Sequence, residues 1–237
     1  MVTSILKLAH VQRPKIPTLL SAFITLLNDR LGETIVFPLL PFLLERFTSS
    51  GSTLGLLAGT YAISQFSAAP LIGALSDRFG RKPVIIICVA GSVLGLCLFA
   101  ITVSVDWNNF LPPWAISLPL LLLFFARIID GISGGTAATA TAVLADISTP
   151  TNRAKTFGLI GVAFGLGFLL GPGLGTTLAK FSVTLPVWAA TAFAIANLAL
   201  VIWVLPETHP VSARSALPRK RDLNPFSQLA LVFLNPL

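Results

Sequence analysis

The chain has 237 residues, of which 54% are hydrophobic and only 11% are charged, and its mean hydropathy is +0.87. Soluble domains average about 25% charged residues, so this composition excludes a water-soluble globular protein. The net charge of +7 does not indicate nucleic-acid binding. The basic residues lie between long hydrophobic blocks rather than in one patch with aromatic residues.

The hydrophobic blocks are long enough to cross a membrane, which takes roughly 20 mostly apolar residues as a helix. We predict an all-α membrane protein with six transmembrane helices, at residues 17–44, 53–75, 83–104, 116–140, 155–179 and 185–205. The predicted domains are a cytoplasmic N-terminal segment at 1–16, the six-helix bundle at 17–205, and a basic cytoplasmic linker with a truncated apolar continuation at 206–237.

The lysines and arginines outside the predicted helices are unevenly distributed. When the connections are taken in order, twelve of them fall on one side of the membrane and two, Arg46 and Lys180, on the other. Positive charge marks the cytoplasmic loops of membrane proteins. We therefore expect a multi-pass protein of the cell (inner) membrane with both termini in the cytoplasm.

Five ionisable residues lie inside the predicted helices. The first helix holds Asp29, Arg30 and Glu33, and the fourth holds Arg127 and Asp130. A charge at the membrane centre costs roughly 2.5–3.5 kcal/mol if it faces lipid, so we expect these side chains to face the bundle interior and to pair. The functional hypothesis is a polar cavity in which a carboxylate takes up and releases a proton. The alternative is a static salt-bridge cluster that orients two helices.

A charged loop with two glycines joins the second and third predicted helices. We expect Gly73 to allow a close approach and Gly80 a tight reversal, and Asp77 to lie near the start of the third helix, where the dipole favours an acid. The residues expected to anchor this turn at the cytoplasmic face are Arg78, Arg81 and Lys82. Charge pairs with Asp146 and Arg153 of the next cytoplasmic loop are expected to hold one conformation closed.

The fifth predicted helix is rich in glycine. Glycines at four-residue spacing let helices pack backbone to backbone, and a proline removes a helical hydrogen bond and bends the helix. The residues of this predicted helix-bend motif are Gly167, Gly171, Pro172 and Gly175. Taken alone, such a pattern is often only a packing face.

These segments resemble the motifs of a known family. Residues 73–85 (GALSDRFGRKPVI) fit the loop pattern G-x-L-a-D-r-x-G-r-k-x-x-l, and residues 167–175 (GFLLGPGLG) are similar to g-x-x-x-G-P-x-x-G-G. Residues 127–134 (RIIDGISG) resemble R-x-x-q-G-x-g, with Asp130 in place of the usual glutamine. Residues 29–41 (DRLGETIVFPLLP) resemble a first-helix pattern of drug exporters. The family is the major facilitator superfamily, and the resemblance is to its proton-coupled drug antiporters of the tetracycline-efflux type.

The resemblance implies two inverted three-helix repeats, a substrate site near mid-membrane, alternating access, and efflux coupled to proton entry. Tyr61 and Gln65 in the second helix also resemble the family, and we place them with the five intramembrane charges in the predicted proton and substrate cavity. Family members have twelve helices in two halves. The expected partners are therefore a second six-helix half, the lipid bilayer, protons and a small-molecule substrate, without nucleic acid, cofactor or metal.

The main hypothesis is the N-terminal half of a proton-coupled exporter of small amphipathic compounds or drugs. The alternatives are a sugar or metabolite porter of the same superfamily, and a non-transporting truncated membrane protein that needs a partner half. An enzyme is not predicted, because His10 and His209 lie outside the helices and no nucleophile–base pair or metal spacing occurs. Whether the chain is a fragment, a truncated gene product or a functional half stays open.

Overall fold

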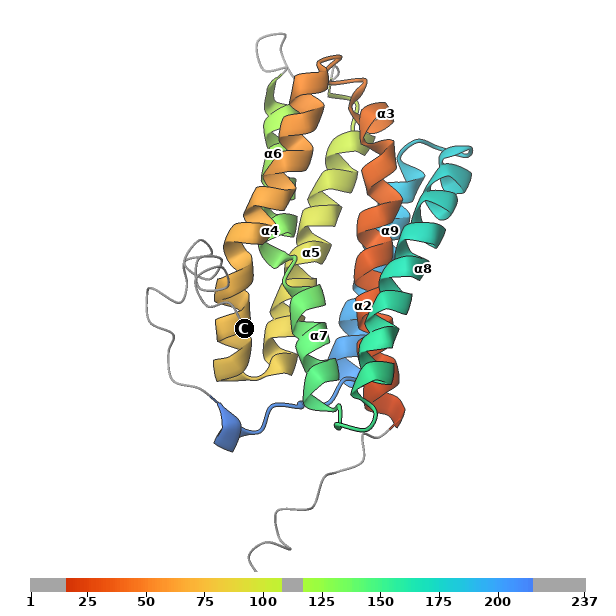
Figure 1. The fold of residues 1–237 in the computed structure, drawn as a ribbon. Helices are drawn as coiled ribbons and strands as arrows, with labels where there is room; N and C mark the ends of the chain where they lie inside the picture. The colour runs from red at the N-terminus through yellow and green to blue at the C-terminus, as the bar shows by residue number, and fades with distance from the viewer. Residues whose placement is uncertain (1–15, 108–116, 215–237) are drawn as a thin grey trace, which may run out of the picture.

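The computed structural model describes residues 16–107 and 117–214, which form a bundle of long helices without a strand among them (Figure 1). Its elements are α2 (Ile16–Val36), η1 (Phe37–Leu39), α3 (Leu40–Leu44), α4 (Gly51–Phe79), α5 (Arg81–Ser104), α6 (Ser117–Ser133), α7 (Thr136–Asp146), α8 (Arg153–Ala179), α9 (Leu185–Trp203) and η4 (Val211–Ala213). The predicted N-terminal segment and most of the predicted linker lie outside the described residues. The all-helical membrane fold is as predicted.

Two of the six predicted spans are interrupted. The first changes from α2 to the 3-10 turn η1, which contains Pro38, before α3 continues it. The fourth is divided at Gly134 and Gly135 into α6 and α7. Because a break leaves backbone groups without helical partners, other groups bond there: the Gln65 Nε2 donates to the Gly134 carbonyl at 3.3 Å. Each break follows the ionisable residues of its own span by a few positions.

The connection between the second and third spans is shorter than predicted. α4 ends at Phe79 and α5 begins at Arg81, so Gly80 alone connects them, with φ +104. Only glycine adopts this conformation readily, and the tight reversal expected at Gly80 is confirmed. The expectation for Asp77 is wrong: it lies in the last turn of α4, because α4 continues further than its apolar pattern indicated.

The packing of the six spans repeats with an inverted, two-fold relation. α2 packs extensively against α8 and α9, and α6 packs in the same way against α4 and α5. If the first three spans are exchanged in order for the last three, the pair α2–α8 becomes α6–α4, and the pair α2–α9 becomes α6–α5. This is the arrangement of two inverted three-helix repeats that was predicted.

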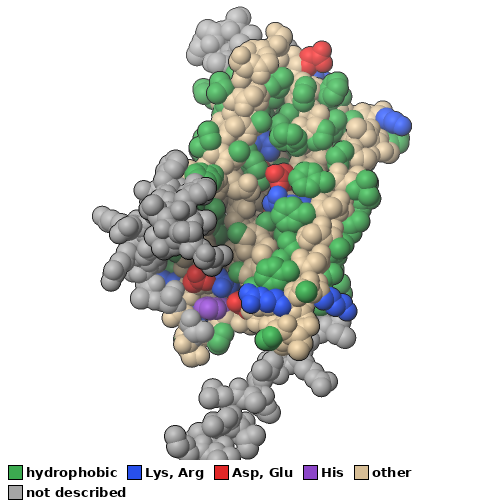
Figure 2. All heavy atoms as spheres, in the orientation of Figure 1, with side chains coloured by type: hydrophobic (Ala, Val, Ile, Leu, Met, Phe, Trp, Pro, Cys, Tyr) green, Lys and Arg blue, Asp and Glu red, His purple; other side chains and the backbone are tan. Residues whose placement is uncertain are grey.

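Four stretches of the described residues are long and apolar enough to cross a membrane by themselves: Arg81–Ser104, Leu118–Asp146, Arg153–Ala179 and Leu185–Trp203. The other two long helices, α2 and α4, are less apolar, since α2 carries three ionisable residues and α4 many small and polar ones. Both pack within the same bundle. Large hydrophobic side chains cover much of the outside, and charged side chains gather halfway along one face, as Figure 2 shows. The protein is thus a multi-pass membrane protein.

Candidate functional site

The charged residues of α2 form a compact triad inside the bundle. The Arg30 guanidinium donates to Asp29 Oδ2 from Nη2 at 2.7 Å, and its Nη1 lies 2.5 Å from Glu33 Oε2. The guanidinium also lies over the ring of Phe164 on α8, 5.0 Å from its centroid. Arg30 is 8% exposed, whereas the Glu33 side chain keeps 27% of its surface exposed. One arginine therefore holds two carboxylates, and Glu33 is the more open of the two.

The position of this triad depends on the glycines of α8. A Cβ at Gly167 would lie 2.7 Å from Arg30 Cβ, one at Gly171 would collide with Thr34, and one at Gly175 would lie 2.6 Å from a carbonyl oxygen of α2. The Thr34 hydroxyl also donates to the Gly167 carbonyl at 2.8 Å. The predicted glycine motif is therefore a close packing face for α2. α8 stays helical through Pro172, and the bend expected at that proline remains a prediction.

Arg127 on α6 is buried beside the triad but is bound much more loosely. Its guanidinium lies over the ring of Phe99 on α5, 4.7 Å from the centroid, and over that of Tyr61 on α4, 5.8 Å from the centroid. Its Nη1 lies 3.7 Å from Asp130 Oδ2, beyond hydrogen-bonding distance. Within the described residues, its Nε and Nη2 have no hydrogen-bond partner, although Arg127 is only 6% exposed. The two rings therefore contact this guanidinium, while its Nε and Nη2 make no hydrogen bond within the described residues.

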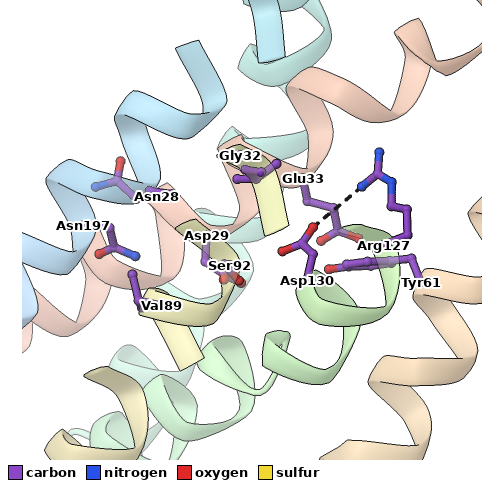
Figure 3. Close-up of a pocket in the computed structure, with 12 residues that line it drawn as sticks. Asn28, Asp29, Gly32, Glu33, Tyr61, Val89, Ser92, Arg127, Asp130 and Asn197 are labelled. Carbon is purple, nitrogen blue, oxygen red and sulfur yellow. Dashed lines mark ion pairs between the residues drawn. The ribbon is translucent and has the colours of Figure 1, made fainter. Parts of the chain in front are cut away.

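An inner pocket joins these groups at the centre of the bundle (Figure 3). Asp130 lies close against α5, since a Cβ at Gly95 would be 2.9 Å from Asp130 Cβ. The polar and charged lining residues are Asn28, Asp29, Glu33, Tyr61, Ser92, Arg127, Asp130 and Asn197. The sequence predictions missed Asn28, Ser92 and Asn197. Asn197 was detectable as the one amide in the apolar run of the sixth span, and it donates from Nδ2 to the Thr25 carbonyl at 3.3 Å.

An outer pocket of about 510 Å³ shares three of these side chains, Glu33, Tyr61 and Arg127. Its remaining walls are apolar except for Gln65, and they consist of Phe37, Leu40, Ala58, Ala62 and Gln65. Gln65 donates to the Tyr61 hydroxyl at 3.2 Å and so orients it. Six of the seven residues predicted for the cavity thus line these two pockets, and the seventh, Arg30, pairs with Asp29 and Glu33. No group of three or more His, Cys, Asp or Glu that could hold a metal occurs in the described ranges.

At one end of the bundle, Arg81 joins three elements. Its Nη1 lies 2.5 Å from Asp77 Oδ1 on α4 and donates to the Ser76 hydroxyl at 2.6 Å, and its Nε donates to Asp146 Oδ2 on α7 at 3.0 Å. Arg81 is 8% exposed. The structure therefore places Asp77, Arg81 and Asp146 together, as the predicted charge pairs across the two loops require. Their role in gating remains a prediction.

A residue that the sequence predictions missed completes this end. Glu207, after the sixth span, accepts hydrogen bonds from the backbone N–H groups of Arg81 at 2.9 Å and Lys82 at 3.3 Å. These are the first residues of α5, so the carboxylate satisfies unpaired N–H groups and lies favourably in the dipole of that helix. The Lys82 Nζ donates to the Ile202 carbonyl at 2.8 Å. The acid expected at the start of the third span is therefore Glu207, not Asp77.

The other predicted gating residues lie at this end with different contacts. Arg78 lies over the ring of Phe79 at 5.4 Å, and Arg153 over that of Phe157 at 5.6 Å. A Cβ at Gly73 would meet no described atom within 4 Å. The close approach expected at Gly73 is therefore absent from this conformation of the described residues.

Comparisons with known proteins identify the family of this fold. The model of the Major Facilitator Superfamily matches residues 20–237. The class C tetracycline resistance protein of Escherichia coli is 36% identical over 206 residues, which cover 86% of this chain and 48% of the relative. Human major facilitator superfamily domain-containing protein 10 is 32% identical over 235 residues, covering 87% of this chain and 48% of the relative.

Solved structures give the same result. The crystal structure of the human organic anion transporter MFSD10 matches with a TM-score of 0.73 and 31% identity, over 93% of this chain and 55% of that one. A D-xylose–proton symporter matches in fold, with a TM-score of 0.64 and 21% identity, over 81% and 48% of the two chains. The chain spans about half the length of the curated relatives it matches. It belongs to the major facilitator superfamily, whose members are membrane transporters.

Proposed function

We propose that the protein is the N-terminal half of a proton-coupled exporter of small amphipathic compounds, in the inner membrane, with the Arg81 end of the bundle in the cytoplasm. The observation that carries the proposal is the group of five ionisable side chains in the bundle interior, three acidic and two basic. Such residues are expensive in a membrane and typically mark ion or substrate pathways.

The uneven pairing within this group supports a changeable site rather than a static one. Arg30 binds its two carboxylates at 2.5 and 2.7 Å, whereas Arg127 lies 3.7 Å from Asp130 without a hydrogen bond. A purely structural cluster gains most when every buried donor is satisfied. The loosely bound pair, next to a pocket, is where a proton or a substrate would change the pairing at the smallest cost.

The three carboxylates are the candidates for the proton carrier, and neutralising them one at a time tests the proposal. The complete transporter that has this chain as its N-terminal half, and its Asp29→Asn, Glu33→Gln and Asp130→Asn variants, would be reconstituted in vesicles with a pH-sensitive dye, using tetracycline as the probe. Glu45→Gln is the matched control, because Glu45 is an exposed carboxylate at the far end of α3. We expect at least one of the three variants to lose proton movement that depends on tetracycline, and the control to retain it. Proton coupling that survives in all three variants would refute the proposal.

A further inference from the structure

The outer pocket combines two opposite charges with an apolar wall. Arg127 and Glu33 both line it, from α6 and α2, and Phe37, Leu40, Ala58 and Ala62 provide the apolar surface. Figure 3 shows the side chains of Glu33 and Arg127 directed into the same region, with Tyr61 beside them. A pocket lined by one positive and one negative side chain is suited to a ligand that itself carries a positive and a negative group.

The positive side of the pocket has unused hydrogen-bonding capacity. The Nε and Nη2 groups of Arg127 have no partner within the described part of the chain, and the residue is 6% exposed. A buried donor without a partner costs roughly 1–3 kcal/mol, and more when it is charged. Nε and one Nη form the edge of the guanidinium that binds carboxylates through two parallel hydrogen bonds. The guanidinium already contacts the rings of Phe99 and Tyr61, which restricts its motion before a ligand binds.

The negative side is a carboxylate that one arginine holds incompletely. Arg30 serves both Asp29 and Glu33, and the Glu33 side chain remains 27% exposed. The aromatic rings of Phe37 and Tyr61 line the same pocket, and aromatic faces attract ammonium groups. With Asp29, Glu33 and Asp130 against Arg30 and Arg127, the ionised group carries one excess negative charge. A ligand with only an anionic end would therefore raise this excess from one negative charge to two.

We infer that the outer pocket binds amphipathic zwitterions, with the anionic group of the ligand on Arg127, its ammonium group on Glu33, and its apolar part against the wall that includes Phe37 and Leu40. This inference rests on the proposed function in that the outer pocket is the substrate site. It adds the substrate class, which proton coupling does not specify.

A matched set of four probes tests it. 2-Naphthylalanine is the zwitterion, its amide the cation, its N-acetyl derivative the anion, and its N-acetyl amide the neutral form. Binding of each to the purified intact chain in nanodiscs would be measured by calorimetry. We expect the zwitterion to bind at least about tenfold more tightly than each of the other three, a ratio equivalent to about 1.4 kcal/mol.

Charge variants connect the preference to the two residues. Arg127→Gln should bind the zwitterion no more tightly than the cation, and Glu33→Gln should bind it no more tightly than the anion. Arg127→Lys, which keeps the charge without the paired donors, should retain part of the preference, and Arg46→Gln, outside the pocket, all of it. Size-exclusion chromatography and circular dichroism would verify that each variant is folded.

Equal binding of all four probes by the unmodified protein, tighter binding of the anion or cation than of the zwitterion, or no binding at all would overturn the inference. So would an unchanged preference in both charge variants. None of these results depends on proton movement. The binding experiment can therefore refute the zwitterion site while the vesicle experiment still supports proton coupling, and the vesicle experiment can refute proton coupling while the binding experiment supports the zwitterion site.

Discussion

Replacing Gly175 with alanine tests how α2 is held in place. The new Cβ would lie 2.6 Å from the Ile35 carbonyl oxygen, about 0.8 Å short of the 3.4 Å at which ordinary contact begins. The obstacle is backbone rather than a flexible side chain, so α2 and α8 must move apart. Such overpacking typically costs about 1–3 kcal/mol, against a gain of at most about 1 kcal/mol from the better helix propensity of alanine.

Gly165→Ala is the matched control on the same helix, because a Cβ there would meet no described atom within 4 Å. Thermal unfolding in detergent, followed by fluorescence-detected size-exclusion chromatography, would measure both variants. We expect a lower melting temperature for Gly175→Ala, by about 2–4 °C for each kcal/mol lost in a protein of this size, and an unchanged or slightly higher one for Gly165→Ala. Equal shifts in the two variants would refute the close α2–α8 contact.

Three further predictions concern the two charged regions. Arg30→Gln should lower stability by up to about 3–5 kcal/mol, since it leaves two partly buried carboxylates unpaired. Arg127→Gln should cost clearly less, since its Nε and Nη2 make no hydrogen bond within the described residues and its Nη1 lies 3.7 Å from Asp130. Chemical denaturation would rank the two variants, and equal losses would contradict the loose binding of Arg127. Glu207→Ala should speed hydrogen exchange at the first two amides of α5 without affecting the middle of that helix. Gly80→Ala should lower the melting temperature, because φ +104 strains any residue with a Cβ, and an unchanged value would argue against this turn.

Much of the fold was predictable because a membrane limits the choices. Long apolar runs become helices, since no other open structure satisfies the backbone in lipid. The mid-membrane charges had to turn inward for the same reason, and Arg30 does pair with both acids of its own helix. The sequence alone therefore identified the region that forms both pockets.

Features that depend on contacts between distant segments were not predictable. The break at Gly134 depends on Gln65 of another helix bonding the freed carbonyl, and a glycine pair by itself does not stop a helix. Glu207 lies beyond the last span, so nothing local indicated that it caps α5. Asp77 was expected near the start of the third helix, but the apolar pattern ends before α4 does, and Asp77 lies in the last turn of α4, where it pairs with Arg81.

The most direct test of proton-coupled export is a vesicle experiment without an imposed pH gradient. Vesicles that contain the complete transporter, with this chain as its N-terminal half, and a pH-sensitive dye would be given an outward or an inward gradient of tetracycline alone. We predict that protons move against the direction of the substrate in both cases, and that Glu33→Gln or Asp130→Asn abolishes this movement while Glu45→Gln preserves it. Protons that move with the substrate, or tetracycline that crosses without any proton movement, would contradict the proposed exchange.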